Sequence, residues 1–192
     1  MCMEKRPYRM RARAERQAET RQRIVEAAVE LHASIGPAKT SLSAVAERAG
    51  VQRNTLYAHF ADEQTLLRAC TLHWRETHPF PPASRWEPIA DPLERLRRAL
   101  TDVYGWYASV EPEFALFVRD SYLYPAFWRE RTGSLEALAS SLAAPFGRRR
   151  TVRAAVGHAL DFEAWRSLVR RQGLSQKQAV DTMVALVDAL LA

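Results

Sequence analysis

The sequence predicts an all-α protein made of two helical parts. Apolar residues recur at spacings of three and four along most of the chain, which is the period of an amphipathic helix. Capping residues precede several of these segments, and glycine or proline ends them. A proline-rich stretch, residues 79–92, is the expected boundary between the two parts.

Composition places the 192-residue chain among ordinary globular proteins, with 47% hydrophobic and 26% charged residues. No apolar run approaches the roughly eighteen residues of a membrane span, and the basic start lacks the apolar core of a signal peptide. Cys2 and Cys70 are too few for a disulfide framework, which agrees with a reducing compartment. We therefore expect a cytoplasmic protein with no membrane partner.

The net charge of +6 is concentrated near the N-terminus. Residues 1–60 hold 11 basic and 6 acidic side chains, a surplus of +5, whereas residues 61–192 hold 17 and 16, a surplus of +1. Such an uneven distribution is expected of a segment that binds phosphates. A solvated charged face is the alternative interpretation.

The first helix is predicted over residues 15–35, preceded by a flexible basic arm, residues 1–16. Ile24, Ala27 and Leu31 form its apolar stripe, and Gly36-Pro37 ends it. Such an arm can enter a neighbouring minor groove, although many chain termini make no specific contact.

Residues 41–60 predict two short helices joined by a sharp turn at Gly50. The Ser41 hydroxyl can cap the first helix, and Gly50 supplies the positive φ that the turn requires. Val51 and Leu56 are then expected to pack the second helix against the first.

The exposed face of this second helix is polar and carries no acidic residue, which suits an anionic surface that accepts hydrogen bonds. In a helix-turn-helix the start of the second helix meets base edges, where Arg pairs with guanine and Asn or Gln with adenine. An αα-hairpin that merely packs in a bundle is the alternative. The residues expected to read bases are Ser43, Gln52, Arg53, Asn54 and Thr55, and those expected at phosphates are Ser41, Tyr57 and His59.

Residues 20–67 closely resemble the DNA-binding domain of the tetracycline-repressor (TetR) family of bacterial transcription regulators. The features that carry this resemblance are Thr20-Arg21, Ile24, Ala27-Ala28, Leu31, Gly36, Thr40-Ser41, Val45-Ala46, Ala49-Gly50-Val51, Leu56-Tyr57 and His59-Phe60. The resemblance covers about a quarter of the chain. It implies binding to double-stranded operator DNA, usually as a repressor, and a helical C-terminal domain that binds a small effector and forms a homodimer.

Two residues depart from the family pattern. Gln52 stands where a capping Ser or Thr is frequent, and Glu63 stands where Lys is frequent. Gln52 is a poorer cap but can read a base, and no phosphate contact is expected from Glu63. Asp62 and Glu63 instead suit the start of the next helix.

That next helix is predicted over residues 63–77, and the resemblance makes it the link between the DNA reader and the rest of the chain. Further helices are predicted from residue 91, over residues 113–122, and over residues 125–144 with a break at Gly133. Asp91, Pro92 and Glu94 mark the first of these starts, and Pro112 and Pro125 the later ones.

The last two helices are predicted over residues 150–172 and from residue 175 to the end, where Ser175 and Gln178 form a capping box. The final helix is apolar over more than half its circumference, which calls for a second partner, most simply another copy of the chain. In the TetR family the last two helices pair across a two-fold axis. The expected interface residues are Val180, Met183, Val184, Val187, Leu190 and Leu191.

Residues 104–165 are rich in large aromatic side chains. An aromatic set at helical spacing is usually core, but the resemblance implies a cavity here that receives a small, largely apolar molecule. The expected lining residues are Tyr104, Tyr107, Phe117, Arg119, Tyr122, Trp128, His158, Phe162 and Trp165. A surface ion pair with Asp120 is the alternative role for Arg119.

Cys70, His73 and His78 raise a metal-responsive regulator as an alternative, but no fourth ligand follows at a suitable spacing. We expect neither a bound metal nor any other cofactor. Catalysis is not expected either, because no nucleophile with its base, no paired carboxylates and no glycine-rich phosphate loop occurs.

The sequence therefore predicts a three-helix helix-turn-helix domain, residues 17–62, and a ligand-binding and dimerisation domain, residues 63–192. The predicted function is a ligand-responsive transcription regulator, most simply a repressor released from its operator by the effector. A helical carrier that does not bind DNA is the main alternative.

Overall fold

The computed structural model describes residues 5–192, and the side chains from residue 10 onward except those of residues 126–128, 130 and 131. Helices make up nearly all of this part of the chain and no strand occurs in it, which confirms the all-α prediction. None of the described helices combines the length and hydropathy needed to cross a bilayer.

The chain forms two compact units that are interleaved in sequence. Unit 1 comprises Met1–Pro79 and Pro112–Tyr124, and unit 2 comprises Phe80–Glu111 and Pro125–Ala192. The chain therefore leaves unit 1 after the fourth helix, returns at Pro112, and leaves it again after Tyr124.

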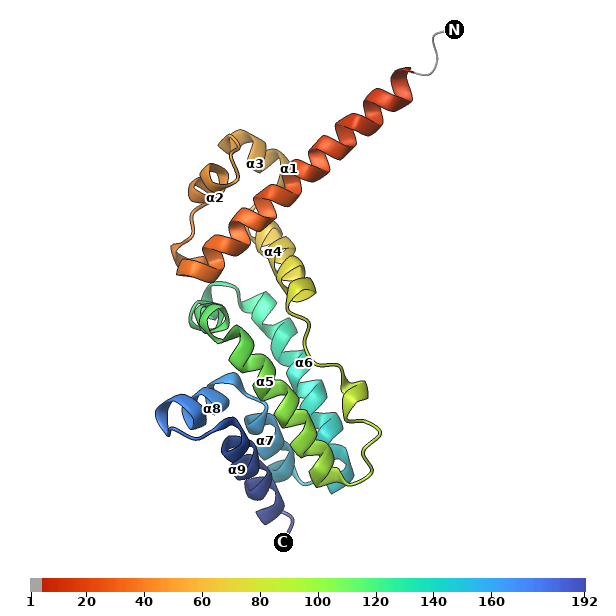
Figure 1. Ribbon diagram of the computed structural model, residues 1–192, viewed down its shortest axis with the longest axis vertical. Helices are drawn as coiled ribbons and strands as arrows, with labels where there is room; N and C mark the ends of the chain where they lie inside the picture. Colours follow the sequence, from red (N-terminus) through yellow and green to blue (C-terminus); the bar gives the residue numbers. More distant parts are fainter. Residues whose placement is uncertain (1–4) are drawn as a thin grey trace. The chain divides into compact units, whose positions relative to one another are not determined.

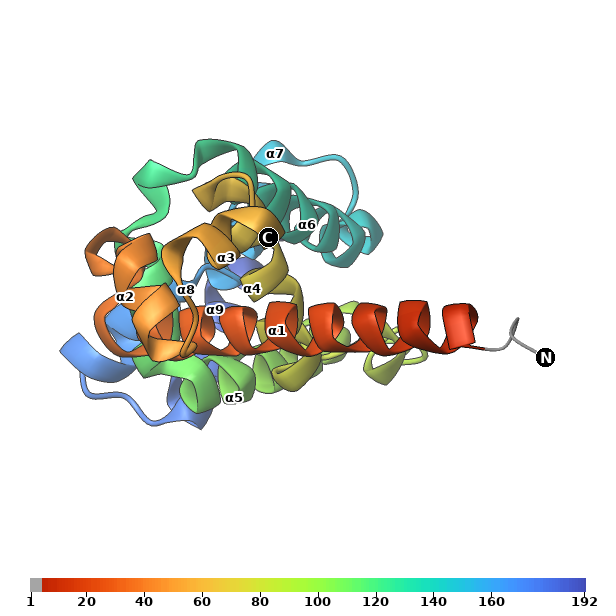
Figure 2. The same ribbon diagram turned by 90° about the horizontal axis from the view of Figure 1, so that it is seen from above.

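Unit 1 is built on a long first helix and three shorter ones (Figure 1). Their bounds are α1 Lys5–Ile35, α2 Leu42–Arg48, α3 Arg53–His59 and α4 Glu63–Thr77, with short 3-10 turns η1 Pro37–Lys39 and η3 Ser121–Leu123. Figures 1 and 2 both show the N-terminal half of α1 extending beyond the other helices of this unit.

A small apolar core joins α1 to the three helices that follow it. It contains Ile24, Ala28, Val45, Leu56, Phe60 and Leu66, each at most 2% exposed. Burying a side chain of this size contributes about 1.5–3 kcal/mol relative to leaving it in water. The core thus fixes the orientation of α2 and α3, on which the predicted reader depends.

The first helix starts at Lys5, about ten residues earlier than predicted. The segment before residue 15 has no apolar stripe, but it is rich in Arg, Ala and Met, which are strong helix formers. Helix propensity extends α1 where hydrophobic periodicity gave no signal.

Unit 2 contains most of α5 Pro92–Arg119, together with α6 Pro125–Ala143, α7 Arg150–Ala159, α8 Phe162–Arg166 and α9 Gln176–Ala189. Two 3-10 turns, η2 Ala83–Arg85 and η4 Ala144–Phe146, and a π-helical turn, η5 Ser167–Arg171, lie between them. The capping box predicted at Ser175 and Gln178 is present at the start of α9.

Three further helix boundaries differ from the prediction. Helix α5 runs through Pro112, where the sequence predicted a break; a proline costs one backbone hydrogen bond but does not always end a helix. The predicted helix over residues 150–172 is interrupted at Asp161, whose carboxylate accepts hydrogen bonds from the backbone N–H of Glu163 and Ala164. The continuous α6 also contains Gly133 without a break.

Candidate nucleic-acid interface

The helix-turn-helix of unit 1 begins at Ser41. Its hydroxyl oxygen accepts a hydrogen bond from Ala44 N–H at 3.1 Å, which caps α2 as predicted. Gly50 then adopts a φ of 65°, and Val51 N–H donates to the carbonyl of Ala46 at 3.0 Å. This turn sets the direction in which α3 leaves α2.

Helix α3 begins at Arg53, and Gln52 occupies the position before it without making a side-chain cap. Gln52, Arg53 and Asn54 are exposed, whereas Thr55 is half-buried. Ser43 on α2 is exposed as well. The structure thus brings the predicted base-reading side chains to the start of one short helix and its neighbour.

Arg53 has a partner that the sequence did not reveal. Its guanidinium donates a hydrogen bond to the hydroxyl of Tyr57 at 3.1 Å and lies 5.6 Å from the centre of that ring. Residues four apart lie above one another on a helix, so the spacing itself was the available signal. Tyr57, predicted as a phosphate ligand, therefore also orients Arg53. His59, the other predicted phosphate ligand on α3, is half-buried.

Two further contacts support the reader from α1. The Arg21 guanidinium lies 4.8 Å from the ring centre of Phe60, immediately after α3. Arg48 at the end of α2 forms an ion pair with Glu30, with an N–O distance of 2.5 Å. Arg48 is thus neutralised within the unit.

The segment that returns to unit 1 at Pro112 is fastened to the end of α1 by Arg119 and Asp120. Asp120 is 2% exposed, and its carboxylate accepts hydrogen bonds from the Arg119 side chain at 2.7 and 2.9 Å and from Ala38 N–H at 2.9 Å. Arg119 also donates to the carbonyl of Ile35 at 3.1 Å. We call this set the Arg119–Asp120 clasp.

The clasp decides between the two roles predicted for Arg119. The predicted ion pair with Asp120 is present, although the Asp120 carboxylate is buried rather than on the surface, and Arg119 lies in unit 1 instead of lining an effector cavity. Its hydrogen bonds hold the pKa of Asp120 below the ordinary value, which keeps the carboxylate charged. Gly36 lies against the clasp with a φ of 88°.

His32 lies beside the clasp at the end of α1. It is 6% exposed, meets the ring of Phe117 edge-on at 6.3 Å, and its Nδ1 has no hydrogen-bond partner among the described protein atoms. Burial lowers the pKa of His32 to about 4, while the nearby Asp120 carboxylate opposes this shift. His32 is therefore a neutral packing residue at physiological pH.

Only part of the set predicted to line one effector cavity is brought together. Tyr104, Tyr107, Phe162 and Trp165 are at most 4% exposed and pack in the core of unit 2. The Tyr104 hydroxyl donates to the carbonyl of Ala159 at 2.9 Å, and that of Tyr107 to Leu160 at 2.6 Å. Such satisfied, packed aromatic residues are core, which was the alternative interpretation of this set.

The other predicted lining residues are scattered. Phe117 packs against His32 and Trp74 in unit 1, Tyr122 is 71% exposed, and His158 is exposed on α7. The side chain of Trp128 lies outside the described residues. The described side chains of this set therefore do not form a single aromatic cavity.

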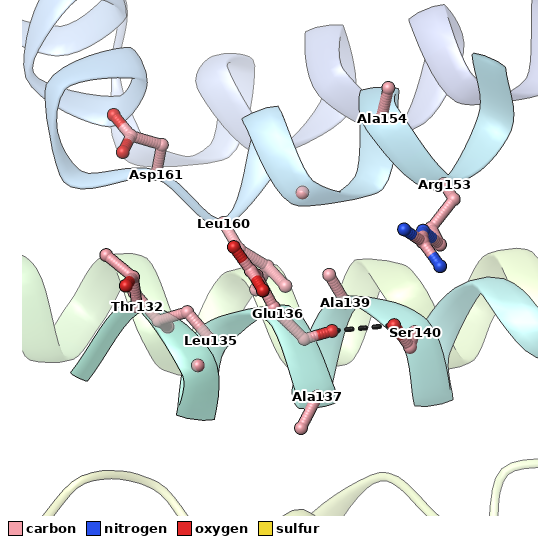
Figure 3. A pocket seen from close by; sticks show the side chains of 12 residues that line it. Thr132, Leu135, Glu136, Ala137, Ala139, Ser140, Arg153, Ala154, Leu160 and Asp161 are labelled. Atoms are coloured by element: carbon pink, nitrogen blue, oxygen red, sulfur yellow. Dashed lines mark hydrogen bonds between the residues drawn. The ribbon is translucent and has the colours of Figure 1, made fainter. Parts of the chain in front are cut away.

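Unit 2 has an open groove between α6 and α7 with a volume of about 590 Å³ (Figure 3). Its walls are formed mostly by small residues, with Glu136, Arg153 and Asp161 as charged members. A second groove, of about 710 Å³, lies between α5 and α9 and includes Tyr104 at its edge. Sequence periodicity could not reveal either groove, because each depends on how two helices pack.

The metal alternative is not supported by the positions of its three residues. Cys70 is buried against the carbonyl of Val25, and burial raises the pKa of its thiol to about 12. His73 lies 3.4 Å from the amide of Gln22, and His78 stacks on Trp74. No group of potential ligands with metal-binding geometry occurs in the described residues.

Most of the residues predicted at a dimer interface are buried in the core of unit 2. Val180, Met183, Val184 and Val187 are at most 5% exposed and pack within unit 2. They cannot also meet a second copy without rearrangement. Just after α9, Leu190 is 41% exposed and Leu191 half-buried, and on α9 Leu186, which the sequence did not single out, is 54% exposed.

Comparison with known proteins finds similarity in the segment that contains α2 and α3. Residues 24–70 match the family described as bacterial regulatory proteins, tetR family. The HTH-type transcriptional regulator TtgR of Pseudomonas putida is 38% identical over 97 residues, which are 50% of this chain and 46% of that protein. The match therefore spans less than half the length of that relative.

Solved structures extend the similarity to nearly the whole chain. A TetR-like transcriptional regulator from Rhodococcus sp. RHA1 matches with a TM-score of 0.61 and 23% identity, covering 88% of this chain and 93% of that one. A second transcriptional regulator from the same organism matches with a TM-score of 0.63 and 18% identity, covering 87% and 95%. At these identities the likeness establishes the fold.

Proposed function

We propose that this chain is a ligand-responsive transcription regulator that binds double-stranded operator DNA as a homodimer, because residues 24–70 match the tetR family of bacterial regulatory proteins. Its simplest action is repression that an effector relieves. We place this activity in the cytoplasm and ascribe no catalysis to the chain.

The observation that carries the proposal is the exposed start of α3. Gln52, Arg53 and Asn54 project from a helix whose other side is pinned by the fully buried Leu56 and Phe60. A base reader needs this combination of free hydrogen-bonding groups and a fixed backbone. The absence of acidic side chains between residues 48 and 61 removes repulsion from phosphates.

A dimer follows from the geometry of DNA. One α3 reads a half-site of a few base pairs, and two copies gain specificity when they occupy major grooves about 34–36 Å apart. The exposed Leu186 on α9 and Leu190 directly after that helix offer an apolar contact for the second copy. This replaces the interface predicted from the buried residues of the same helix.

The effector is proposed to act by shifting a population of dimers. A small molecule that binds better when the two readers are wrongly spaced lowers DNA affinity without touching DNA. We place its site in unit 2, and the groove between α6 and α7 is the first place to search for it (Figure 3).

Selection of DNA from a random pool tests the proposal. The full-length protein should enrich a sequence with two related half-sites about one helical turn apart. A mobility shift with the enriched duplex should resist competition by random DNA. Recovery of no preferred sequence would leave the helical carrier as the better interpretation.

Cell extract added to the bound complex tests the effector. Release of the selected duplex by a small-molecule fraction, but not by buffer, is the expected result. As a control, the same fraction is added to a duplex bound by an unrelated protein. If it releases that duplex too, it acts on the DNA rather than on this regulator.

A further inference from the structure

The positive charge of the DNA-reading unit lies outside the part that defines the family. Residues 24–70 hold four basic and five acidic side chains, a net charge of −1, whereas residues 1–23 hold eight basic and three acidic ones, a net charge of +5. Duplex DNA carries one negative charge per about 1.7 Å of its axis. Most of the cations available to meet it are therefore supplied by the first 23 residues.

The described part of this segment is helical rather than an irregular tail. Helix α1 starts at Lys5, and the contact of Arg21 with Phe60 marks where it meets the end of α3. Residues 5–20 then extend past the three-helix core (Figures 1 and 2). At 1.5 Å per residue they add about 24 Å, the length of about seven base pairs.

Two arginines of this extension, Arg13 and Arg16, follow one side of the helix together with Arg23 just beyond it. Arg13, Arg16 and Arg23 share a face with Ala27, since these positions are separated by three, seven and four residues. Ala27 is buried against the other helices of unit 1, so the arginine face continues on the side where α2–α4 lie. Glu15 lies about a quarter turn away from this face, whereas Glu19 borders it, three residues after Arg16 and four before Arg23.

The charges of these arginines are available to an outside anion, and Arg16 Nε donates a hydrogen bond to the backbone carbonyl of Ala12 at 3.1 Å. Arg13, Arg16 and Arg23 are exposed, and none of them forms an ion pair among the side chains that the structure describes. By contrast, Arg48 is held by Glu30, and Arg11 by Glu15. A merely solvated helix face would be expected to carry more such internal pairs.

We propose that residues 10–23 of α1 form a rigid helical clamp for the phosphate backbone of the duplex that flanks the bases read by α3. The clamp rests on the proposed function, because it acts only when α3 is seated on DNA. It supplies affinity and leaves sequence preference to α3. It also supplies charge that the start of α4, with Asp62 and Glu63, lacks.

The double variant R13Q/R16Q tests the clamp. Gln keeps the helix propensity of Arg but removes its charge, and R148Q/R150Q is the matched control because both arginines are exposed in unit 2. Affinity is measured between 50 and 200 mM salt for the duplex enriched from the random pool, carrying flanks of about ten base pairs.

The salt slope is the slope of the logarithm of the binding constant against the logarithm of salt concentration. The clamp predicts that R13Q/R16Q lowers its magnitude by about 0.9 for each lost phosphate contact, or about 1.8 for each bound protomer. The salt sensitivity across this range then falls about tenfold per protomer. The preference for the enriched sequence over random DNA and the affinity of the control stay unchanged. Trimming the flanks should weaken the wild type and leave R13Q/R16Q nearly unaffected.

The variant A14P tests the helical geometry, because proline breaks α1 in the exposed extension without changing charge. It should lose the contribution of the flanks. Binding of A14P equal to that of the wild type would overturn a rigid clamp, and an equal loss for R13Q/R16Q on trimmed and full duplexes would overturn its placement on the flanks. A wild type without sequence preference would instead refute the proposed function.

Discussion

Base preference is expected to depend on single side chains at the start of α3. Arg53→Ala and Asn54→Ala should each relax preference at one base pair by about 1–3 kcal/mol, because each loses hydrogen bonds to a base edge. The measurement is competition between the selected duplex and variants changed at one position. A uniform loss of affinity for all sequences would contradict the base-reading role.

A substitution of Tyr57 tests the role of Arg53 more finely. Tyr57→Phe keeps the ring beside Arg53 but removes the hydroxyl that accepts its hydrogen bond at 3.1 Å. We expect Tyr57→Phe to reduce base preference less than Arg53→Ala does. In a protein that already carries Arg53→Ala, it should reduce base preference hardly at all. Additive losses would instead make Tyr57 an independent DNA ligand.

Gly36 and Gly50 form a matched pair for stability. Both have positive φ, but a Cβ on Gly36 would come within 2.5 Å of an Asp120 carboxylate oxygen, whereas nothing lies within 4 Å of one on Gly50. Gly50→Ala should cost about 1 kcal/mol through backbone strain alone, and Gly36→Ala about 1–2 kcal/mol more because the clasp must shift. Urea unfolding measures both.

Gly36→Ala should weaken DNA binding only to the extent that it unfolds unit 1. If the two variants are equally stable, the Arg119–Asp120 clasp shifts at little cost, and its contribution to the free energy of unfolding of unit 1 is small. Asp120→Asn, which keeps the shape but removes the charge, then separates packing from charge.

The buried His32 should make stability depend on pH. Its pKa falls from 6.5 to about 4 on folding, so the unfolded chain binds the proton more readily and stability declines as pH falls from 6.5 towards 4. The full window is worth about 3 kcal/mol, and the part above pH 5 about 2 kcal/mol. Urea unfolding at pH 7 and pH 5 measures the loss.

His32→Leu removes the titrating group and should flatten this dependence. Asp120 contributes in a lower window, because its depressed pKa makes its stabilisation disappear only below the pKa of an ordinary carboxyl. Comparison above pH 5 thus isolates the histidine. An unchanged pH dependence in His32→Leu would show that the ring is solvated in solution.

At the scale of helices, local signals predicted boundaries well where a side chain caps the backbone. Ser41, Asp62 and Ser175 each accept the hydrogen bond that their sequence context suggested. Pro112 and Asp161 were misread, because a proline does not reveal whether its helix continues and an Asp within an apolar period does not reveal that it caps. Both outcomes are decided by tertiary packing.

Helix α9 shows why the predicted interface failed. Its apolar residues occupy more than one face, and periodicity alone does not say which face the chain uses for its own core. The structure assigns Val180, Met183, Val184 and Val187 to that core. Deleting the chain from Ser175 would therefore unfold unit 2 rather than yield a folded monomer.

A single exposed residue gives a cleaner test of the dimer. Leu186→Glu should produce monomers in sedimentation and weaken DNA binding, because a charge replaces a side chain that is 54% exposed on α9. Gln172→Glu adds the same charge at an exposed position outside α9. A dimer that persists in Leu186→Glu would place the interface on another surface.

At the scale of the molecule, the sequence predicted the fold class and the helix-turn-helix but not the packing of the aromatic residues. The reader is local, since α2, α3 and their turn lie within about twenty residues. The aromatic residues were misjudged because core and cavity wall differ only in how helices from distant parts of the chain meet. Tyr107, for example, contacts residues more than fifty positions away.

The interleaved path of unit 1 has a consequence for how the protein is made. Synthesis proceeds from the N-terminus at about 5–20 residues per second, so Arg119 and Asp120 emerge well after Gly36 and Ala38. The reader helices can form early, but the residues of the clasp are synthesised several seconds later. During that time His32 and its neighbours lack the side chains that bury them in the folded protein. A gene fragment that stops at Pro79 would encode the base-reading helices without the part that completes their unit.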